Sequence, residues 1–442
     1  MFPRLSAPRL IVLAFAALIL AGTLLLKIPA ANHGISWLDA FFMSVSAATV
    51  TSLQTVDPAR AFTPLGQAIL AGLVQLGGLG IMTVTTVGAL LVGRRLGFRD
   101  LLVVREELGS PGSPRNVLRL IGQVTLVTLL LEGAGAAILA AHFAARGFDT
   151  AKALGYGVFN AVAAFCNAGF NIFKEGASVY AGDWIFNLTL VFLIVMGGLG
   201  FPVIVNLYYY AKIRHLTLQS KLVLLTTAVL LVIGTLGVAL LEWSNPLTLG
   251  SEPPGTRVLM ALFQGVTPRS AGFATVTYSD MREPTLAVQI ALMFIGTGPV
   301  STGGGIRVTT LALIFLIILS QVRGQDVVSA FGRRIPSSLI AKSLTVLSLS
   351  TLLVSVAALG LMISDGLDFL TALFEITSAF GTVGLSLGAG PGLASELGAS
   401  GKLLVALVMF AGRVGPITVI LALSERSKPR RYAFPEEDIA VG

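Results

Sequence analysis

The sequence contains very little charge and almost no sulfur or imidazole chemistry. Only 12% of its 442 residues are charged and 55% are hydrophobic, whereas an average soluble domain has about twice that charged share. Disordered chains need high charge and low hydrophobicity, so the composition excludes disorder as well as a water-soluble enzyme. One cysteine, Cys166, and three histidines exclude an internal disulfide framework and a Cys/His zinc cluster.

Nucleotide-binding and hydrolytic motifs are also missing. The chain has no P-loop and no GxGxxG opening a βαβ unit, which are the glycine motifs that bind phosphates. Its net charge of +8 does not indicate nucleic acid, because the basic residues lie between apolar runs, where lipid headgroups explain them. We therefore expect no enzymatic activity, no covalent cofactor and no nucleic-acid partner.

Long apolar runs make up most of the chain. A bilayer core of about 30 Å requires about 20 mostly apolar residues per helix. Eight runs are candidates: 10–26, 61–93, 118–145 around Glu132, 184–211, 222–241, 285–306, 343–364 and 402–424 around Arg413. The first resembles a signal peptide, but its 17 uncharged residues exceed the usual apolar core of one, so we interpret it as an uncleaved membrane helix.

The connections between these runs alternate between many and few basic residues. The basic ones lie at the amino terminus, 94–119, 212–221, 323–342 and 426–431. Connections rich in Lys and Arg stay on the cytoplasmic side of a membrane. This predicts a multi-pass protein of the plasma membrane with both termini cytoplasmic, in agreement with an even number of spans.

Each outward connection contains a second, shorter apolar stretch that ends in small residues. The four stretches are 37–53, 154–170, 257–273 and 369–385, and one aligned column holds Ser52, Gly169, Gly272 and Gly384, about 110 residues apart. About 12 residues are too few to span, and non-helical backbone at membrane depth survives only against protein or water. The sequence therefore predicts an all-α polytopic membrane protein with four pseudo-symmetric helix/pore-helix/helix repeats around one central ion pore.

The repeat boundaries follow from these runs. We expect repeat 1 at 9–93, repeat 2 at 115–212, repeat 3 at 213–323 and repeat 4 at 336–425. The remaining segments, expected in the cytoplasm, are 1–8, 94–114, 324–335 and 426–442.

The short stretches resemble the filter loops of the Trk/Ktr/HKT superfamily of cation transporters, and of its Ktr-type membrane subunits in particular. The motifs are Thr49-Val50-Thr51-Ser52-Leu53, Asn167-Ala168-Gly169-Phe170, Ser270-Ala271-Gly272-Phe273 and Thr382-Val383-Gly384-Leu385. The resemblance covers about residues 9 to 425 and implies that main-chain carbonyls bind K⁺ or Na⁺ in place of water. The implied ion-binding residues are Thr49, Val50, Thr51, Ser52, Cys166, Asn167, Ala168, Gly169, Arg269, Ser270, Ala271, Gly272, Gly381, Thr382, Val383 and Gly384.

Ser52 departs from the glycine of the other three repeats. Its Cβ and hydroxyl alter a turn that glycine relaxes, and superfamily members with serine here are the more sodium-permeable ones. The resemblance therefore implies monovalent cation passage more firmly than strict potassium selectivity.

Glycine motifs interrupt the second helix of each repeat, at 77–80, 197–202, 296–305 and 412–416. Close helix packing through small residues explains the first two. The third has six Gly or Pro among ten residues and cannot form a straight helix. The resemblance implies that it is an intramembrane gating loop, and the implied gate residues are Gly296, Thr297, Gly298, Pro299, Ser301, Thr302, Gly303, Gly304, Gly305 and Arg413.

Charged residues at membrane depth have two interpretations each. The resemblance implies that Arg413 is a positive charge inside the filter that limits throughput, and a structural ion pair with Glu132 is the alternative. Arg307 either supports the gate or extends to the cytoplasmic surface. Glu375 either attracts cations or forms hydrogen bonds with main-chain groups. The side chain of Cys166, which is also among the implied ion-binding residues, we interpret as a packing residue.

The resemblance also implies partners. In the family the membrane subunit is a homodimer on a cytoplasmic ring of nucleotide-binding RCK subunits, so nucleotide is expected only there. Our hypothesis is channel-like uptake of K⁺, with Na⁺ permeation or dependence. An alternating-access secondary transporter of a small cation or solute is the alternative, although its inverted repeats would show opposite charge bias, and the four units here share one orientation.

Overall fold

The computed structural model describes residues 7–80, 114–325, 327–388 and 390–423, and it has the order long helix, short helix, return helix four times. The long first helices are α1 (Ala7–Lys27), α7 (Pro114–Ala145), α11 (Leu218–Glu242) and α15 (Ser337–Asp365). The short helices are α2 (Trp37–Thr49), α8 (Thr150–Phe165), α12 (Pro254–Val266) and α16 (Phe369–Phe380). The return helices are α4 (Pro64–Leu79), α9 (Trp184–Leu199), α13 (Glu283–Phe294) and α17 (Ala399–Val414).

Three return helices continue beyond a break, and smaller elements connect the rest. The continuations are α10 (Phe201–Ile213), α14 (Val308–Val322) and α18 (Pro416–Leu423). The short connecting helices are α3 (Pro58–Ala61), η1 (Ala177–Tyr180), η2 (Tyr278–Asp280) and η3 (Leu393–Ser395). An antiparallel pair of two-residue strands, β1 (Ser329–Ala330) and β2 (Arg333–Arg334), is a small exception to the predicted all-α class.

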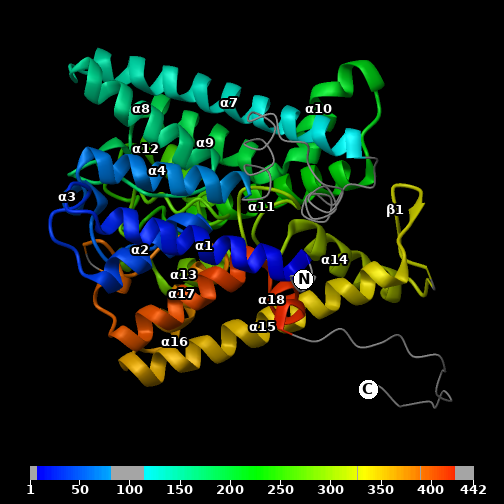
Figure 1. Ribbon diagram of the computed structural model, residues 1–442. Coiled ribbons are helices and arrows are strands. Elements are labelled where there is room, and N and C mark those ends of the chain that lie inside the picture. The colour runs from blue at the N-terminus through cyan, green and yellow to red at the C-terminus, as the bar shows by residue number, and fades with distance from the viewer. Residues whose placement is uncertain (1–6, 81–113, 326, 389, 424–442) are drawn as a thin grey trace.

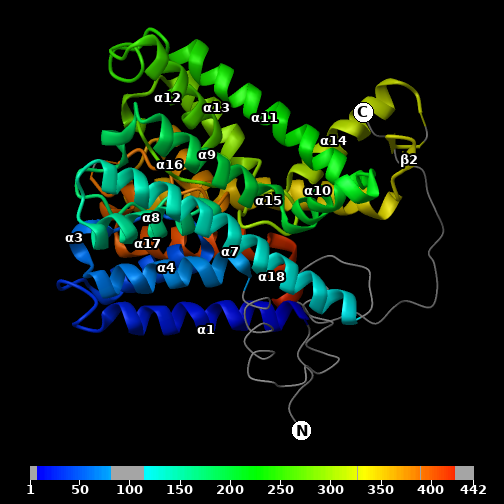
Figure 2. The same cartoon turned by 90° about the horizontal axis from the view of Figure 1, so that it is seen from above.

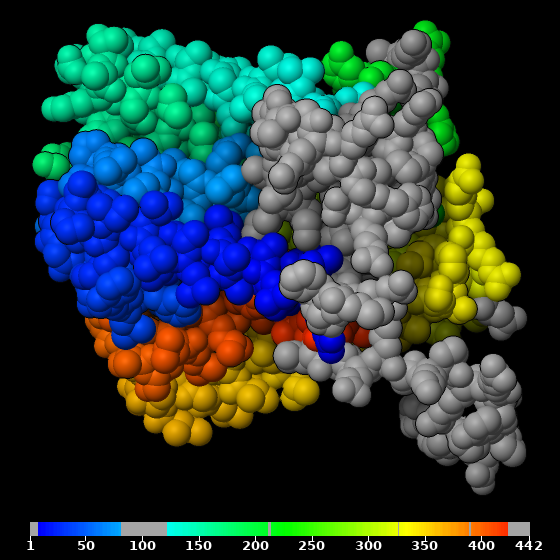
Figure 3. Space-filling model, in the orientation of Figure 1, coloured from blue at the N-terminus to red at the C-terminus, as the bar shows by residue number. Residues whose placement is uncertain are grey.

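Contacts between the repeats close a ring. The return helix of each repeat touches the short helix of the next: α4 with α8, α9 with α12, α13 with α16, and α17 with α2. Helices α1, α4 and α7 follow one another across the molecule in both ribbon views (Figures 1 and 2). In the space-filling view, the blue surface of the first repeat lies between the cyan-green second repeat and the orange fourth repeat (Figure 3). The first and last repeats of the chain are therefore neighbours.

The first helices carry the apolar length expected of membrane spans. Among the described residues, α1, α7, α11 and α15 are long and apolar enough to cross a membrane, and the number rises to six if each bent pair counts as one span. Large apolar side chains on their outer faces are exposed, such as Leu130 (62%) and Ile363 (85%). Such exposure suits contact with lipid rather than water.

Three of the eight predicted runs are broken, and each break falls at a glycine motif where the sequence predicted an interruption. The α9–α10 pair bends by 102° and the α17–α18 pair by 97°. Gly200 and Gly415 end the first helix of each pair with φ of 91° and 92°, a conformation that favours glycine. The run predicted at 285–306 ends as a helix at Phe294. The second half of the run at 61–93, and most of the predicted cytoplasmic segments, lie outside the described residues.

Candidate functional site: four turns beneath the short helices

The chain makes a tight turn after each short helix, and the four turns meet. A Cβ atom built on Gly384 would lie 2.0 Å from Ser52 Oγ. One built on Gly272 would lie 2.0 Å from the Val383 carbonyl oxygen, and one built on Gly169 would lie 2.2 Å from the Gly272 carbonyl carbon. Glycine is required at these three positions because the neighbouring turn approaches so closely. We call the segments turn 1 (50–53), turn 2 (167–170), turn 3 (270–273) and turn 4 (381–385).

The turns adopt backbone that side chains usually avoid. The residue two positions before the aligned column is left-handed in every turn, with φ of 60° at Val50, 59° at Asn167, 75° at Ser270 and 47° at Thr382. Such non-glycine positions cost about 1–3 kcal/mol each and cluster where a ligand or a close contact holds them. Ser52 is left-handed as well, with φ of 65°, near the 72° of Gly272 and the 92° of Gly384. Serine in turn 1 therefore shares the left-handed backbone of Gly272 and Gly384, which Gly169 does not adopt.

Glycines in the return helices allow the short helices to come this near. A Cβ built on Gly77 would lie 2.0 Å from the Ala48 carbonyl oxygen, and one on Gly412 would lie 2.0 Å from that of Phe380. A Cβ built on Gly197 would lie 1.8 Å from the Phe165 carbonyl oxygen. Close packing, which we expected for the first two motifs, is what the structure contains.

The 296–305 loop lies against turns 2, 3 and 4. The Asn167 amide is 2.6 Å from Thr302 Oγ1, and the Gly304 amide donates to Ser270 Oγ at 3.1 Å. A Cβ built on Gly304 would lie 2.5 Å from Thr382 Oγ1. The sequence predicted a broken helix here, but no local pattern could predict which turn each loop residue touches.

Arg413 connects this loop to the first repeat. Its guanidinium donates to the carbonyl oxygens of Thr302 and Gly77, and to that of Gly78 at 3.3 Å. The side chain is buried, and a buried guanidinium requires such acceptors. These contacts differ from the ion pair with Glu132 that the sequence left open.

Glu132 belongs to a separate buried cluster behind turn 2. Its carboxyl oxygens accept from Gln75 Nε2 at 3.1 Å and from the Cys166 thiol at 3.7 Å. A Cβ built on Gly78 would lie 2.6 Å from Cys166 Sγ. The Cys166 side chain therefore packs between helices, as expected, and any contribution to an ion site would come from its main chain.

Glu375 and Arg269 are buried near the turns and contact main-chain groups. Glu375 accepts from the Leu387 amide at 3.0 Å and from the Ser386 hydroxyl, which favours the main-chain interpretation of its role. Arg269 Nη2 lies 3.5 Å from the Gly296 carbonyl oxygen. Its side chain therefore faces the loop.

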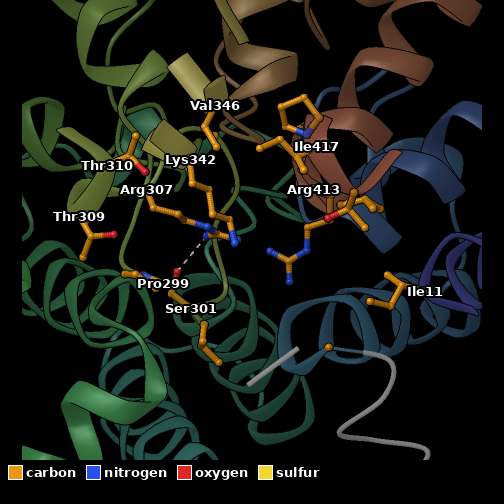
Figure 4. A pocket seen from close by; sticks show the side chains of 18 of the residues that line it. Ile11, Pro299, Ser301, Arg307, Thr309, Thr310, Lys342, Val346, Arg413 and Ile417 are labelled. Atoms are coloured by element: carbon orange, nitrogen blue, oxygen red, sulfur yellow. Dashed lines mark hydrogen bonds between the residues drawn. The ribbon is translucent and has the colours of Figure 1, made fainter. Parts of the chain in front are cut away.

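Two cavities lie on the two sides of this assembly. One of about 620 Å³ is lined by the 296–305 loop, and Arg307, Lys342 and Arg413 point into it (Figure 4). Arg307 Nη1 donates to the Gly303 carbonyl oxygen at 2.6 Å, which favours support of the loop over extension to the surface. The described residues that line this cavity include no Asp or Glu. Lys342, which the sequence placed in the basic cytoplasmic segment 323–342, adds to the positive charge of this cavity.

The second cavity, of about 540 Å³, is lined by Gly169, Gly272 and Gly384 and by the segments that follow them. Its lining includes the carboxylates of Asp57 and Glu175. Turns 2, 3 and 4 thus line one cavity, and the loop beneath the turns lines the other.

Comparison with known proteins agrees with this geometry. A family model described as a cation transport protein, TrkH, matches residues 5–430. The chain belongs to the TrkH family of cation transport proteins. It is 34% identical to the Ktr system potassium uptake protein B of Bacillus subtilis over 99% of the chain and 97% of that relative. It is 32% identical to the potassium/sodium uptake protein NtpJ of Enterococcus hirae, over 99% of the chain and 98% of the relative. The resemblance stated from the sequence is confirmed.

The fold of this TrkH family member also has a solved counterpart. The crystal structure of the potassium transporter TrkH from Vibrio parahaemolyticus matches with a TM-score of 0.76 at 20% identity, covering 96% of this chain and 86% of that one. The predicted helical membrane-transporter fold is confirmed.

Proposed function

We propose that this chain takes up K⁺, with Na⁺ as a second permeant or required ion, through a path between the four turns. The supporting observation is that Ser52, Gly169, Gly272 and Gly384, from four separate repeats, come together between two cavities. The printed names of the relatives include potassium uptake and potassium/sodium uptake. A narrow passage lined by main-chain carbonyls is a means of replacing the hydration shell of a small cation.

Ser52 is proposed to lower the discrimination between the two ions. Its hydroxyl is 3.4 Å from the Val383 carbonyl oxygen, one of the oxygens proposed to bind cations. A hydroxyl at this distance competes with the ion for the carbonyl and adds a second kind of ligand. Glycine at the position would remove both effects.

The 296–305 loop and Arg413 are proposed as the gate below the turns. The loop separates the turns from a cavity whose charged lining is entirely basic among the described residues. A fixed positive charge on the path raises the energy of a passing cation. Displacement of the loop would therefore both widen the path and move the Thr302 carbonyl away from Arg413.

The remaining proposals concern assembly. The repeat boundaries at 9–93, 115–212, 213–323 and 336–425, both cytoplasmic termini and the plasma membrane follow from charge and hydropathy. The names of the relatives describe a Ktr system, which supports a partner subunit. We propose that the chain forms a homodimer and that this partner is a cytoplasmic nucleotide-binding RCK subunit bound through the basic segments. Nucleotide would bind to that partner.

The direct test is ion flux through the purified protein in liposomes. The proposal predicts that K⁺ and Na⁺ pass down their gradients, with K⁺ favoured, and that chloride does not. Protein that folds in liposomes yet passes neither cation, with or without its cytoplasmic partner, would contradict it.

A further inference from the structure

Ser270, in turn 3, places its hydroxyl between the 296–305 loop and turn 4. Ser270 Oγ is 2.7 Å from the Gly381 carbonyl oxygen and 3.2 Å from that of Thr382. The same oxygen accepts from the Gly304 amide at 3.1 Å, and the residue is fully buried. A main-chain N–H can only donate a hydrogen bond and a carbonyl oxygen can only accept one. The Ser270 hydroxyl proton must therefore point to turn 4. The bonds form one chain from Gly304 through Ser270 to Gly381.

Thr302 makes a matching contact on the side of repeat 2. Its hydroxyl oxygen lies 3.1 Å from the Phe165 carbonyl oxygen and 2.6 Å from the side-chain amide of Asn167. The loop is therefore hydrogen-bonded to turn 2 through one hydroxyl and to turns 3 and 4 through another. Both contacts must break if the loop moves away.

The fit at Ser270 depends on glycine in the loop. A Cβ built on Gly303 would lie 2.6 Å from Ser270 Oγ, and one on Gly304 would lie 2.5 Å from Thr382 Oγ1. Neither glycine has a positive φ. A side chain at Gly304 would therefore be excluded by turn 4, and one at Gly303 by Ser270 of turn 3 and by Thr297 of the loop, rather than by the backbone conformation of the glycine itself.

We propose that the Ser270 hydroxyl couples the position of the 296–305 loop to ion selectivity in the turns. The inference rests on the proposed function, because it assumes that the Gly381 and Thr382 carbonyls bind the ion and that the loop moves. When Gly304 donates to it, the hydroxyl is a stronger donor to turn 4, since bonds in a chain polarise one another. Departure of the loop weakens that bond and leaves the Gly381 carbonyl freer to adapt to an ion of another size.

Coupling of this kind is reciprocal. An ion that draws the Gly381 carbonyl away from Ser270 also weakens the hold on Gly304, so it favours release of the loop. Selectivity and gating would then depend on the same hydroxyl, which makes Ser270 a positioning residue for both.

The test compares the K⁺/Na⁺ permeability ratio of full-length protein in liposomes with three variants. The first is Ser270→Ala, the second lacks residues 297–304, and the third combines both changes. The shortened chain can be joined directly from Gly296 to Gly305, because the two ends of the loop already lie side by side. The Gly296 main-chain N–H donates to the Ile306 carbonyl oxygen at 2.9 Å, and a Cβ built on Gly296 would lie 3.4 Å from Gly305 Cα.

We expect Ser270→Ala to lower the ratio about five-fold, the equivalent of one neutral hydrogen bond. The shortened protein should show a similar drop, and adding Ser270→Ala to it should lower the ratio by less than about two-fold, because coupled sites are not additive. Equal fold-changes in both backgrounds, or an unchanged ratio in Ser270→Ala, would overturn the coupling.

Two further variants keep the test decisive. Gly304→Ala disturbs the same contact from the loop side and should also lower the ratio, which matters if Ser270→Ala folds poorly. Ser46→Ala is the matched control, because the Ser46 hydroxyl is buried in α2 with no hydrogen bond among the described residues. An equal drop in Ser46→Ala would show a nonspecific effect and overturn the proposal. Absence of cation flux in every protein, including the unaltered one, would instead contradict the proposed function.

Discussion

Replacing Arg413 with alanine is predicted to increase cation flux. The guanidinium points into the cavity of about 620 Å³ below the loop (Figure 4). It also donates to the Thr302 carbonyl oxygen. A cation crossing a cavity of this size passes within about 8 Å of the charge, and at an effective dielectric constant of about 20 the repulsion is about 2 kcal/mol. Removing it corresponds to a gain of about 30-fold in rate where this step limits passage.

A lysine at the same position separates the charge from the hydrogen bonds. Arg413→Lys keeps the positive charge but lacks the planar fork that serves Thr302 and Gly77 together. If charge limits passage, Arg413→Lys should conduct at nearly the rate of the unaltered protein, and Arg413→Ala should conduct much faster. The assay is K⁺ uptake into liposomes at matched protein content, with folding checked by size-exclusion chromatography. Flux in well-folded Arg413→Ala that equals or falls below that of the unaltered protein would refute the reasoning and favour a structural role for the side chain.

The other predictions concern the turns, the loop and the helix contacts. Ser52→Gly should raise the K⁺/Na⁺ permeability ratio in bi-ionic measurements, because it removes the hydroxyl beside turn 4, and an unchanged ratio would exclude Ser52 from selectivity. Deleting 297–304 should raise total flux and weaken its dependence on the cytoplasmic partner; unchanged flux would place the gate elsewhere. Gly412→Ala should lower the free energy of unfolding by about 2 kcal/mol or more, because the new Cβ would lie 2.0 Å from the Phe380 carbonyl oxygen. The matched Gly72→Ala has nothing within 4 Å and should be neutral or stabilise by up to about 1 kcal/mol; equal effects at the two sites would contradict the packing.

Local patterns in the sequence predicted much of this fold. Apolar length predicted α1, α11 and α15, because each is one uninterrupted helix whose outer face exposes large apolar side chains. Alignment of the short stretches predicted that one column of residues is structurally equivalent. The left-handed φ of Val50, Asn167, Ser270 and Thr382 agrees with that alignment residue by residue.

Contacts between repeats could not be predicted in the same way. The bonds from Arg413 to Thr302 and from Thr302 to Asn167 join residues more than a hundred positions apart, and no periodicity encodes such a pairing. The bends at Gly200 and Gly415 also exceeded expectation, because apolar composition alone does not distinguish a straight helix from one that turns by about a right angle. Proline one or two residues after a glycine was the available signal, as Gly200 and Pro202 in one motif and Gly415 and Pro416 in the other.

The central claim is that cations occupy the space between the four turns. The most direct measurement is the anomalous scattering of Tl⁺, which replaces K⁺, in crystals of the protein. We predict density on the axis between turns 1 to 4, within coordination distance of the carbonyl oxygens of Thr51 and Val383. Tl⁺ bound only in the cavity near Asp57 and Glu175, with nothing between the turns, would contradict the claim.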